Sequence, residues 1–381
     1  MKYRMKDTVD LLALLLLGIL LFTFPEVSAA AAQAGISLCL RLLVPSLFPF
    51  FVLSSLLIST GVVQICVRPL SRLFSPIFGT GSAGATIFLL GMVGGYPVGA
   101  RTLSQLVQRG ECSREEALRL SLFCNNCGPA FFIGAAGVGV FGSKTAGFLL
   151  LTANFVSALL LAVFLRIWRG KVASLSSSSS SSSTVSLLTV FPDCVSVAFS
   201  STLSICAYVI LFSVLTALVD ASGILPFFVE NLSSLTPVGS TPGLWRSFLM
   251  GLLELSTGTA SLQDVAYAPA ALLLAAFLLG WGGFSVHCQS LPFWREANIP
   301  AAPYLAAKFT QGILAAFITV LAAPLLPLSL PAMAPTTASL PSPSLLQQEL
   351  LALWGLAGGY FCLFGKKGVE KTGKSRYNNP K

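Results

Sequence analysis

The chain has 381 residues, of which 55% are hydrophobic and only 10% are charged. A soluble protein carries roughly 25% charged residues, so this composition excludes a water-soluble enzyme or receptor and predicts an all-α polytopic membrane protein. The net charge of +9 does not indicate nucleic-acid binding, because more than half of it lies in the tail Lys366–Lys381, beside the last apolar segment. A basic tail in that place favours the cytoplasmic side of a membrane.

Eight apolar segments approach the roughly 20 residues that a spanning helix needs. In chain order they are Leu11–Phe24, Ala31–Thr60, Leu122–Phe141, Thr145–Trp168, Leu187–Val219, Val265–Val286, Tyr304–Leu326 and Leu350–Phe364. Two further stretches, Ala85–Gly99 and Phe248–Gly258, are short and glycine-rich, and we predict that both are re-entrant or broken helices. Backbone of that kind persists at membrane depth only where protein covers it or where it lines a wet cavity.

The arginines and lysines between the segments predict that both termini are cytoplasmic. Under this segment count the basic loops fall on one side, provided that Ala85–Gly99 dips into the membrane and returns. The first segment has an alternative interpretation, because a basic start, an apolar core and the small residues Ser28–Ala34 also resemble a cleavable signal peptide. An uncleaved first span, in contrast, lets the second segment start outside.

An internal similarity predicts two repeats of opposite orientation. Glycine, valine, leucine, serine and leucine recur at one constant spacing in Gly61–Leu73 and Gly223–Leu235, and Phe88–Val93 similarly matches Phe248–Leu253. Because the first unit enters from outside and the second from inside, the repeats are inverted. Inverted repeats with broken helices are typical of secondary transporters, whose substrate lies near the membrane midplane.

This similarity divides the chain into six parts. They are an N-terminal anchor or signal peptide (1–30), a first repeat (31–170), a polyserine cytoplasmic linker (171–186), a second repeat (187–328), a proline- and serine-rich outer loop (329–349), and a last span with the basic tail (350–381). A run of serines buries nothing, so the linker is expected to be an extended hydrophilic loop.

Polar or glycine-rich clusters interrupt the apolar segments and predict a substrate site. Glycine and proline at such a break free backbone groups to meet a ligand, and an arginine beside it attracts an anion or extends to the lipid headgroups. Paired asparagines either line an interrupted helix or bond across helices. The candidate substrate-binding residues are Gly94, Gly95, Tyr96, Pro97, Arg101, Asn125, Asn126, Gly128, Ser256, Thr257 and Ser285.

Two ionisable residues are candidates for ion coupling or gating. Glu254 lies within an apolar segment, where a carboxylate is costly and suggests a function. It would bind a coupling proton or Na⁺, or else satisfy free backbone N–H groups. His287, the only histidine, is either a proton relay near the inner end of its span or a hydrogen-bonded residue.

The remaining motifs do not indicate an enzyme, a metal site or another cofactor. Cys124 and Cys127 form a CxxC pair, but no second pair and no nearby histidine accompany them, so zinc or redox chemistry is not expected. The nine cysteines lie mostly in apolar runs, which is typical of small buried hydrophobic residues. A phosphate-binding loop and a GxSxG motif are both missing from the sequence.

Several of these motifs resemble a known family. They are PSLFPF (Pro45–Phe50), GGYPVGAR (Gly94–Arg101), GECSREEA (Gly110–Ala117), FCNNCGPAFFIGAAGVGVFG (Phe123–Gly142), GLLELSTG (Gly251–Gly258) and FLLGWGGFSVHCQ (Phe277–Gln289). Together they resemble the sporulation integral membrane protein family YlbJ, or SpoVV, over about residues 10–330. The resemblance implies a nucleoside-recognition Gate domain and an organisation similar to concentrative nucleoside transporters. The Cys-Asn-Asn-Cys-Gly-Pro motif and the polyserine linker depart from the family pattern.

The resemblance also implies a function. It suggests a transporter in the outer forespore membrane that moves dipicolinate, a small planar dianion. Glycine-rich helix ends, asparagine amides and Arg101 suit such an anion, whereas Glu254 would repel it and is assigned to ion coupling or gating instead. Two alternatives stay open: the same fold carrying nucleosides or another metabolite, and an assembly protein of the spore envelope. The expected partners are the lipid bilayer and the anion, with a homo-oligomer compatible with the sequence.

Overall fold

The computed structural model describes residues 5–60, 62, 71, 73–80, 82–172, 186–235, 242–265 and 268–326. In these ranges the chain forms helices and connecting turns, without a strand. Five helices are long and apolar enough to cross a membrane: Pro25–Leu43, Lys144–Arg169, Leu187–Ala221, Pro269–Glu296 and Ala301–Leu325. Shorter apolar helices accompany them. The prediction of an all-α polytopic membrane protein is therefore confirmed.

The first half of the described chain contains helices of very different lengths. They are α1 (Met5–Thr23), α2 (Pro25–Leu38), the π-helical turn η1 (Cys39–Leu43), α3 (Val44–Ser59), α5 (Ser82–Gly94), α6 (Val98–Gln108), α7 (Arg114–Ser121), the π-helix η2 (Phe131–Val140) and α8 (Lys144–Arg169). The start of α8 is set by Ser143, whose hydroxyl accepts a hydrogen bond from the backbone N–H of Ala146 at 3.3 Å.

The second half follows a similar order of long, short and long helices. It contains α9 (Leu187–Ala221), α10 (Ile224–Leu235), α11 (Pro242–Leu253), α12 (Leu255–Ala260), a 3₁₀ turn (Ser261–Asp264), α13 (Ala268–Trp281), α14 (Gly283–Glu296), α15 (Ala301–Ala322) and a last 3₁₀ turn (Ala323–Leu325). The long helix α9 begins this half, and the long helix α15 closes it.

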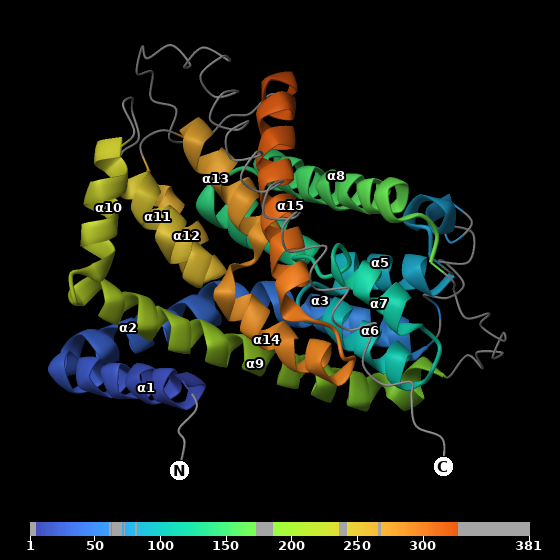
Figure 1. Ribbon diagram of the computed structural model, residues 1–381, viewed down its shortest axis with the longest axis horizontal. Helices are drawn as coiled ribbons and strands as arrows, with labels where there is room; N and C mark the ends of the chain where they lie inside the picture. Colours follow the sequence, from blue (N-terminus) through green and yellow to red (C-terminus); the bar gives the residue numbers. More distant parts are fainter. Residues whose placement is uncertain are drawn as a thin grey trace.

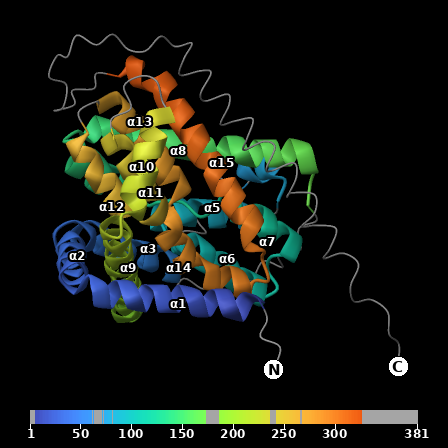
Figure 2. The ribbon, with the colours of Figure 1, turned by 60° about the vertical axis from the view of Figure 1, so that its left-hand side comes forward.

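The long helices α8 and α9 lie on the outside of the bundle, and the broken helices lie between them (Figure 1). Helices α8 and α9 lie on opposite sides, with α13, α14 and α15 crossing between them (Figure 1). Helices α2 and α3 pack along α9, whereas α1 lies at the edge beside α2 (Figure 2). Most leucines of α1 are exposed, as on a helix surrounded by lipid.

Three predicted spans, those of α8, α9 and α15, agree with the structure to within a few residues. The first span ends as predicted, but α1 begins at Met5 and not at Leu11. The second span begins at Pro25 rather than at Ala31, because proline at the first helical position starts a helix well. The residues Ser28–Ala34, considered as part of a signal peptide, lie within α2.

Two predicted spans are wrong in their extent. Leu122–Phe141 is not a continuous span: residues 122–128 are non-helical, and η2 contains only ten residues. Gly128 and Pro129 explain this, since proline has no N–H for a preceding turn. Val265–Val286 is interrupted at Gly282, which takes a left-handed φ of 95°, and the chain continues as α14 to Glu296. His287 therefore lies inside this span and not near its end.

The two glycine-rich stretches are broken helices, as predicted. Helix α5 ends at Gly94 and α6 starts at Val98, while α11 ends at Leu253 and α12 starts at Leu255.

Both of these hairpins close through a pair of glycines. A Cβ at Gly99 would lie 3.2 Å from the Cα of Gly91, and a Cβ at Gly258 would collide with the backbone of Gly251. The arms of each hairpin thus touch backbone to backbone. Gly91 and Gly251 are matched positions of the predicted repeat, so this shared construction is what such a repeat requires.

Some predictions concern residues outside the described ranges. The polyserine run, the outer loop 329–349, the last span Leu350–Phe364 and the basic tail belong to this group, as does most of Gly61–Leu73.

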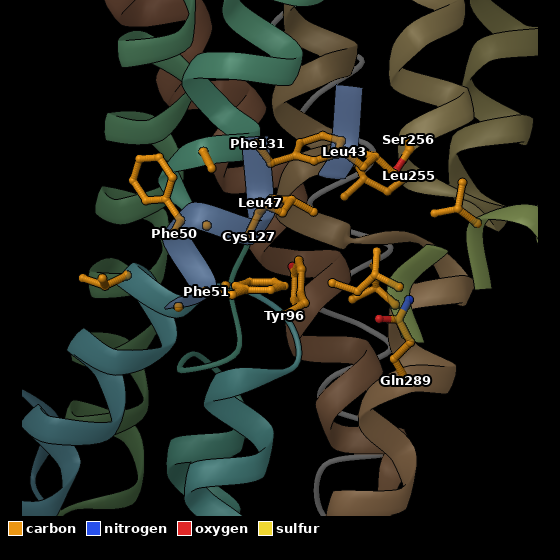
Figure 3. A pocket seen from close by; sticks show the side chains of 18 of the residues that line it. Leu43, Leu47, Phe50, Phe51, Tyr96, Cys127, Phe131, Leu255, Ser256 and Gln289 are labelled. Carbon is orange, nitrogen blue, oxygen red and sulfur yellow. The ribbon is translucent and has the colours of Figure 1, made fainter. Parts of the chain in front are cut away.

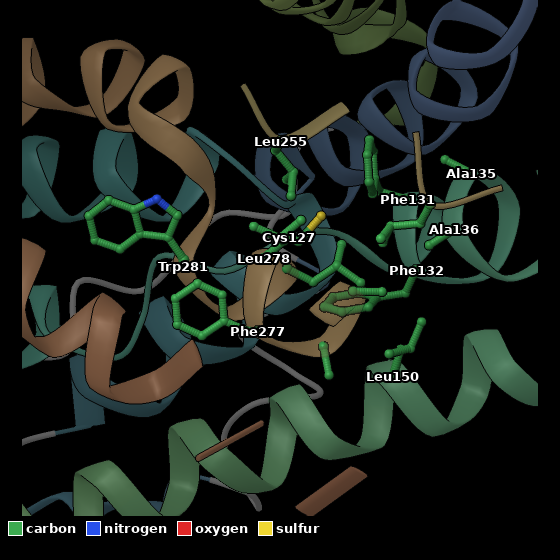
Figure 4. Packing of buried hydrophobic residues seen from close by; sticks show 14 of the residues in the cluster. Cys127, Phe131, Phe132, Ala135, Ala136, Leu150, Leu255, Phe277, Leu278 and Trp281 are labelled. Carbon is green, nitrogen blue, oxygen red and sulfur yellow. The ribbon is translucent and has the colours of Figure 1, made fainter. Parts of the chain in front are cut away.

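The buried apolar residues of the described chain form two clusters. The larger one joins both halves, because it contains side chains from η2, α8 and α13, among them Phe132, Leu150 and Leu278 (Figure 4). The smaller one surrounds α5, α6 and α7. The broken helices are therefore packed in protein, which membrane-depth backbone requires.

The glycine contact between α11 and α12 yields a stability prediction. We expect Gly258→Val to lower the free energy of unfolding by about 1–3 kcal/mol, because its side chain would overpack the backbone of Gly251. Gly18→Val in α1 is the control, since no atom lies within 4 Å of a Cβ there. Thermal melting of the detergent-solubilised protein measures both variants. Equal melting temperatures would contradict the close backbone contact.

Candidate functional site

A cavity lies where three helix breaks meet. It is bounded by the break after α5, the non-helical segment before η2 and the break before α12, with α3, α9 and α14 completing the wall. Figure 3 shows the Tyr96 ring between Phe51 and Gln289. The volume of about 50 Å³ holds one or two waters. Organic ligands occupy sites of roughly 300–1,000 Å³, so the site has to enlarge before it can hold one.

Glu254 forms the break between α11 and α12 and caps the second helix. Its backbone is extended, and its carboxylate accepts hydrogen bonds from the N–H groups of Ser256 at 3.0 Å and Thr257 at 2.5 Å. The hydroxyl of Ser285 donates to the same carboxylate at 3.4 Å. The side chain is 1% exposed. Of the two roles considered for Glu254, the structure shows the one that satisfies free backbone N–H groups.

Two side chains of the cavity lining each carry a buried polar atom without a hydrogen-bond partner. The hydroxyl of Tyr96 and the side-chain carbonyl oxygen of Gln289 are buried and have no hydrogen-bond partner. A buried polar group without a partner costs about 1–3 kcal/mol. Such atoms are expected where a ligand supplies the missing hydrogen bonds.

A second polar network lies on the other side of Tyr96 and is centred on Lys308. The ammonium of Lys308 donates to the side-chain oxygens of Gln311 at 2.7 Å and Asn126 at 3.2 Å. The Gln311 amide donates in turn to Asn126 at 2.7 Å and to Asn154 at 3.4 Å. The Asn126 amide donates to the carbonyl of Phe123, which helps to shape the non-helical segment.

His287 belongs to the same region through Tyr304. Its Nδ1 lies 3.1 Å from the Tyr304 hydroxyl, and the ring packs edge-on against Trp281 with 4.3 Å between ring centroids. Tyr304 also accepts a hydrogen bond from the Asn125 amide at 2.9 Å, and that amide donates to Ser290 at 2.9 Å. Asparagines 125 and 126 thus connect the first half of the chain to α14 and α15.

The structure brings most of the predicted site residues together, but not all. Those that line the cavity are Gly94, Gly95, Tyr96, Gly128, Glu254 and Ser256. Those that instead contact Glu254 or belong to the second network are Thr257, Ser285, Asn125, Asn126 and His287. Pro97 and Arg101 do not line the cavity. Arg101 is exposed on α6, because Gly99 and Ala100 take the buried face of that helix.

Lys308, Gln311, Tyr304 and Gln289 were missed by the sequence analysis. Lys308 lay inside the predicted span Tyr304–Leu326, where an ionisable residue suggests a function in the same way as Glu254. The same argument therefore identified Glu254 from the sequence but was not extended to Lys308. The glutamines carried no comparable signal, because their partners are distant in sequence and become neighbours only in the folded chain.

Comparison with known proteins places the chain in a class and then in a family. A bundle of apolar helices, with broken helices around a cavity, defines a multi-pass integral membrane protein. The Gate family model, described as nucleoside recognition, matches residues 40–144. The sporulation integral membrane protein YlbJ of Bacillus subtilis (strain 168) is 30% identical over 320 residues, which cover 78% of each chain. The protein therefore belongs to the YlbJ family of sporulation integral membrane proteins. No solved structure matches it.

The cap formed by Glu254 yields the second prediction. Glu254→Gln retains the shape of the side chain but only one carbonyl oxygen, so one of the two backbone N–H groups loses its partner. We expect a loss of about 1–3 kcal/mol in the free energy of unfolding, measured by thermal melting of purified protein. Ser285→Ala is the control, because it removes only the long 3.4 Å contact and should cost less. If Glu254→Gln melts at the wild-type temperature, the carboxylate is not the cap.

Proposed function

We propose that this protein is a secondary transporter, not an enzyme, and that it moves a small organic anion across the membrane, with dipicolinate as its first candidate cargo. The carrying observation is the cavity bounded by helix breaks from both halves of the chain, whose lining includes Tyr96 and Gln289, each with a buried polar atom that has no hydrogen-bond partner. Broken helices around a central site are the usual construction of secondary transporters. The sporulation role of the relative supports dipicolinate as the cargo.

The small volume of the cavity supports alternating access as the mechanism. A site of about 50 Å³ has to enlarge before an organic molecule enters. The two hairpins are stiff units, since their arms touch through glycine pairs, so each would move as one body during such an opening. Glu254 would serve gating, because its carboxylate holds the start of α12 against α14 through Ser285. A proton or Na⁺ taken up at this carboxylate would loosen those contacts.

In this proposal the membrane is the outer forespore membrane of a sporulating cell, and both termini are cytoplasmic. The relative supports the first statement by its sporulation role, and the placement of basic residues in the sequence supports the second. Arg101 would then lie at the cytoplasmic surface, where an exposed arginine attracts anions toward the protein or contacts lipid headgroups.

A nucleoside cargo is the second candidate, favoured by the match to the nucleoside-recognition model. Nucleosides are uncharged and offer both hydrogen-bond donors and acceptors, which would suit the Tyr96 hydroxyl and the Gln289 carbonyl. Competition decides between the two cargoes. Excess uridine or adenosine should leave dipicolinate uptake unchanged if the cargo is the anion, and should abolish it if the site is built for nucleosides.

The unpartnered cavity atoms give the decisive variant. Tyr96→Phe retains the ring and removes a buried hydroxyl that has no partner in the protein, so stability should be unchanged or higher. Dipicolinate transport should fall at least tenfold, because a carboxylate of the cargo loses the hydrogen bond that the Tyr96 hydroxyl would donate. Terbium fluorescence of spores measures transport in a strain that makes dipicolinate but lacks its own copy of this protein.

Three results separate the hypotheses. Restoration by the wild type and loss in Tyr96→Phe support the transporter and its site together. Restoration by both proteins would place the cargo elsewhere in the molecule. A well-expressed wild type that restores normal spore envelopes without accumulating dipicolinate would support an assembly role and overturn the proposed function.

A further inference from the structure

The side chain of Lys308 lies at the centre of the folded chain. It projects from the middle of α15, which spans Ala301–Ala322, and it is 0% exposed. Its neighbours come from segments far apart in sequence: Asn126 from the non-helical segment before η2, Gln311 one turn along α15, and Tyr96 from the break after α5. The first half of the chain therefore folds around a lysine that the second half supplies.

Lys308 has no acidic partner in the part of the chain that the structure describes. It forms no ion pair there, and the Glu254 carboxylate is engaged by backbone N–H groups and by Ser285. An ammonium has three N–H donors. Two of them reach the amide oxygens of Asn126 and Gln311, and the remaining contact is the face of the Tyr96 ring, 5.6 Å from Nζ to the centroid. Amides and an aromatic ring solvate the charge without neutralising it.

Tyr96 separates this cation from the cavity. Its ring contacts Lys308 and also forms part of the cavity wall, next to Cys127 and Gly128. Its hydroxyl is unpartnered and packs against Gly282, where a Cβ would lie 2.9 Å from the hydroxyl oxygen. The Tyr96 side chain is thus held by packing alone, with no hydrogen bond at its end. Displacement of this one ring would join the cavity to the ammonium.

We propose that Lys308 is the residue that recognises the charge of the cargo, so that the site binds a carboxylate in preference to an uncharged molecule of the same shape. This inference rests on the proposed function and adds its selectivity. A carboxylate that enters beside Tyr96 supplies the missing counter-ion, whereas a neutral ligand leaves the buried charge unpaired. Asn126 and Gln311 hold the ammonium in place, and the cargo brings the neutralising charge. The membrane interior strengthens this preference, because little water is present to screen it.

A series of ligands with equal shape and different charge tests the proposal. Pyridine-2,6-dicarboxylate, pyridine-2-carboxylate and the neutral pyridine-2,6-dicarboxamide are compared as stabilisers of the purified full-length protein in thermal melting, and as substrates in proteoliposomes. The wild type should bind the dicarboxylate at least tenfold more tightly than the dicarboxamide. Lys308→Gln retains hydrogen bonding to Asn126 and Gln311 without the charge, and should reduce this ratio to about threefold or less.

Two controls keep the test decisive. Lys144→Gln removes an exposed lysine at the start of α8 and should leave the ratio at its wild-type value. Lys308→Arg retains the charge and should retain the preference for the dicarboxylate even if uptake slows. Binding is measured on monodisperse protein, so a variant that does not fold is replaced by Lys308→Met, which also removes the charge.

Each result has one meaning. A wild-type preference that persists in Lys308→Gln would overturn the role of Lys308 while leaving the transporter intact. Equal binding of the dicarboxylate and the dicarboxamide by the wild type would overturn charge recognition itself. Charge-selective stabilisation without uptake would support the anion site and contradict the transport function.

Discussion

The whole structure depends on one constraint: a helix that is interrupted inside an apolar layer has to find partners for the backbone groups that it releases. The protein solves this differently at each break. The carboxylate of Glu254 caps α12, and the amide of Asn126 bonds the carbonyl of Phe123. At Gly282 a left-handed residue redirects the chain from α13 into α14. The cavity lies between these breaks. Polar side chains of the site therefore also form the hydrogen bonds that backbone groups at the breaks need.

The cavity and the lysine network form two compartments that share one wall. Glu254 lies on the cavity side and Lys308 on the other, with the Tyr96 ring between them. Opposite charges in an apolar interior attract strongly, yet here each is satisfied by its own hydrogen bonds and the two do not pair.

The sequence predicted those features that depend on neighbouring residues. Apolar length predicted α8, α9 and α15, and glycine with proline or a single acid predicted the breaks at Gly94–Pro97 and Glu254. The sequence overestimated the span at Leu122–Phe141, because hydropathy averages across a polar interruption. In the structure residues 122–128 of this interruption are not helical. The contacts of Lys308 with Asn126 and Tyr96 were not predictable in the same way. They join residues about 180 or more positions apart, and only the packing of α15 brings them together.

The small cavity has a consequence for the rate at which a ligand of the proposed kind could bind. A molecule of the size of a pyridine dicarboxylate does not fit into a space of about 50 Å³, so the site has to enlarge first. Helix motions of that kind take microseconds to milliseconds in proteins. At high ligand concentration the observed binding rate should therefore reach a plateau set by this opening step and not by diffusion.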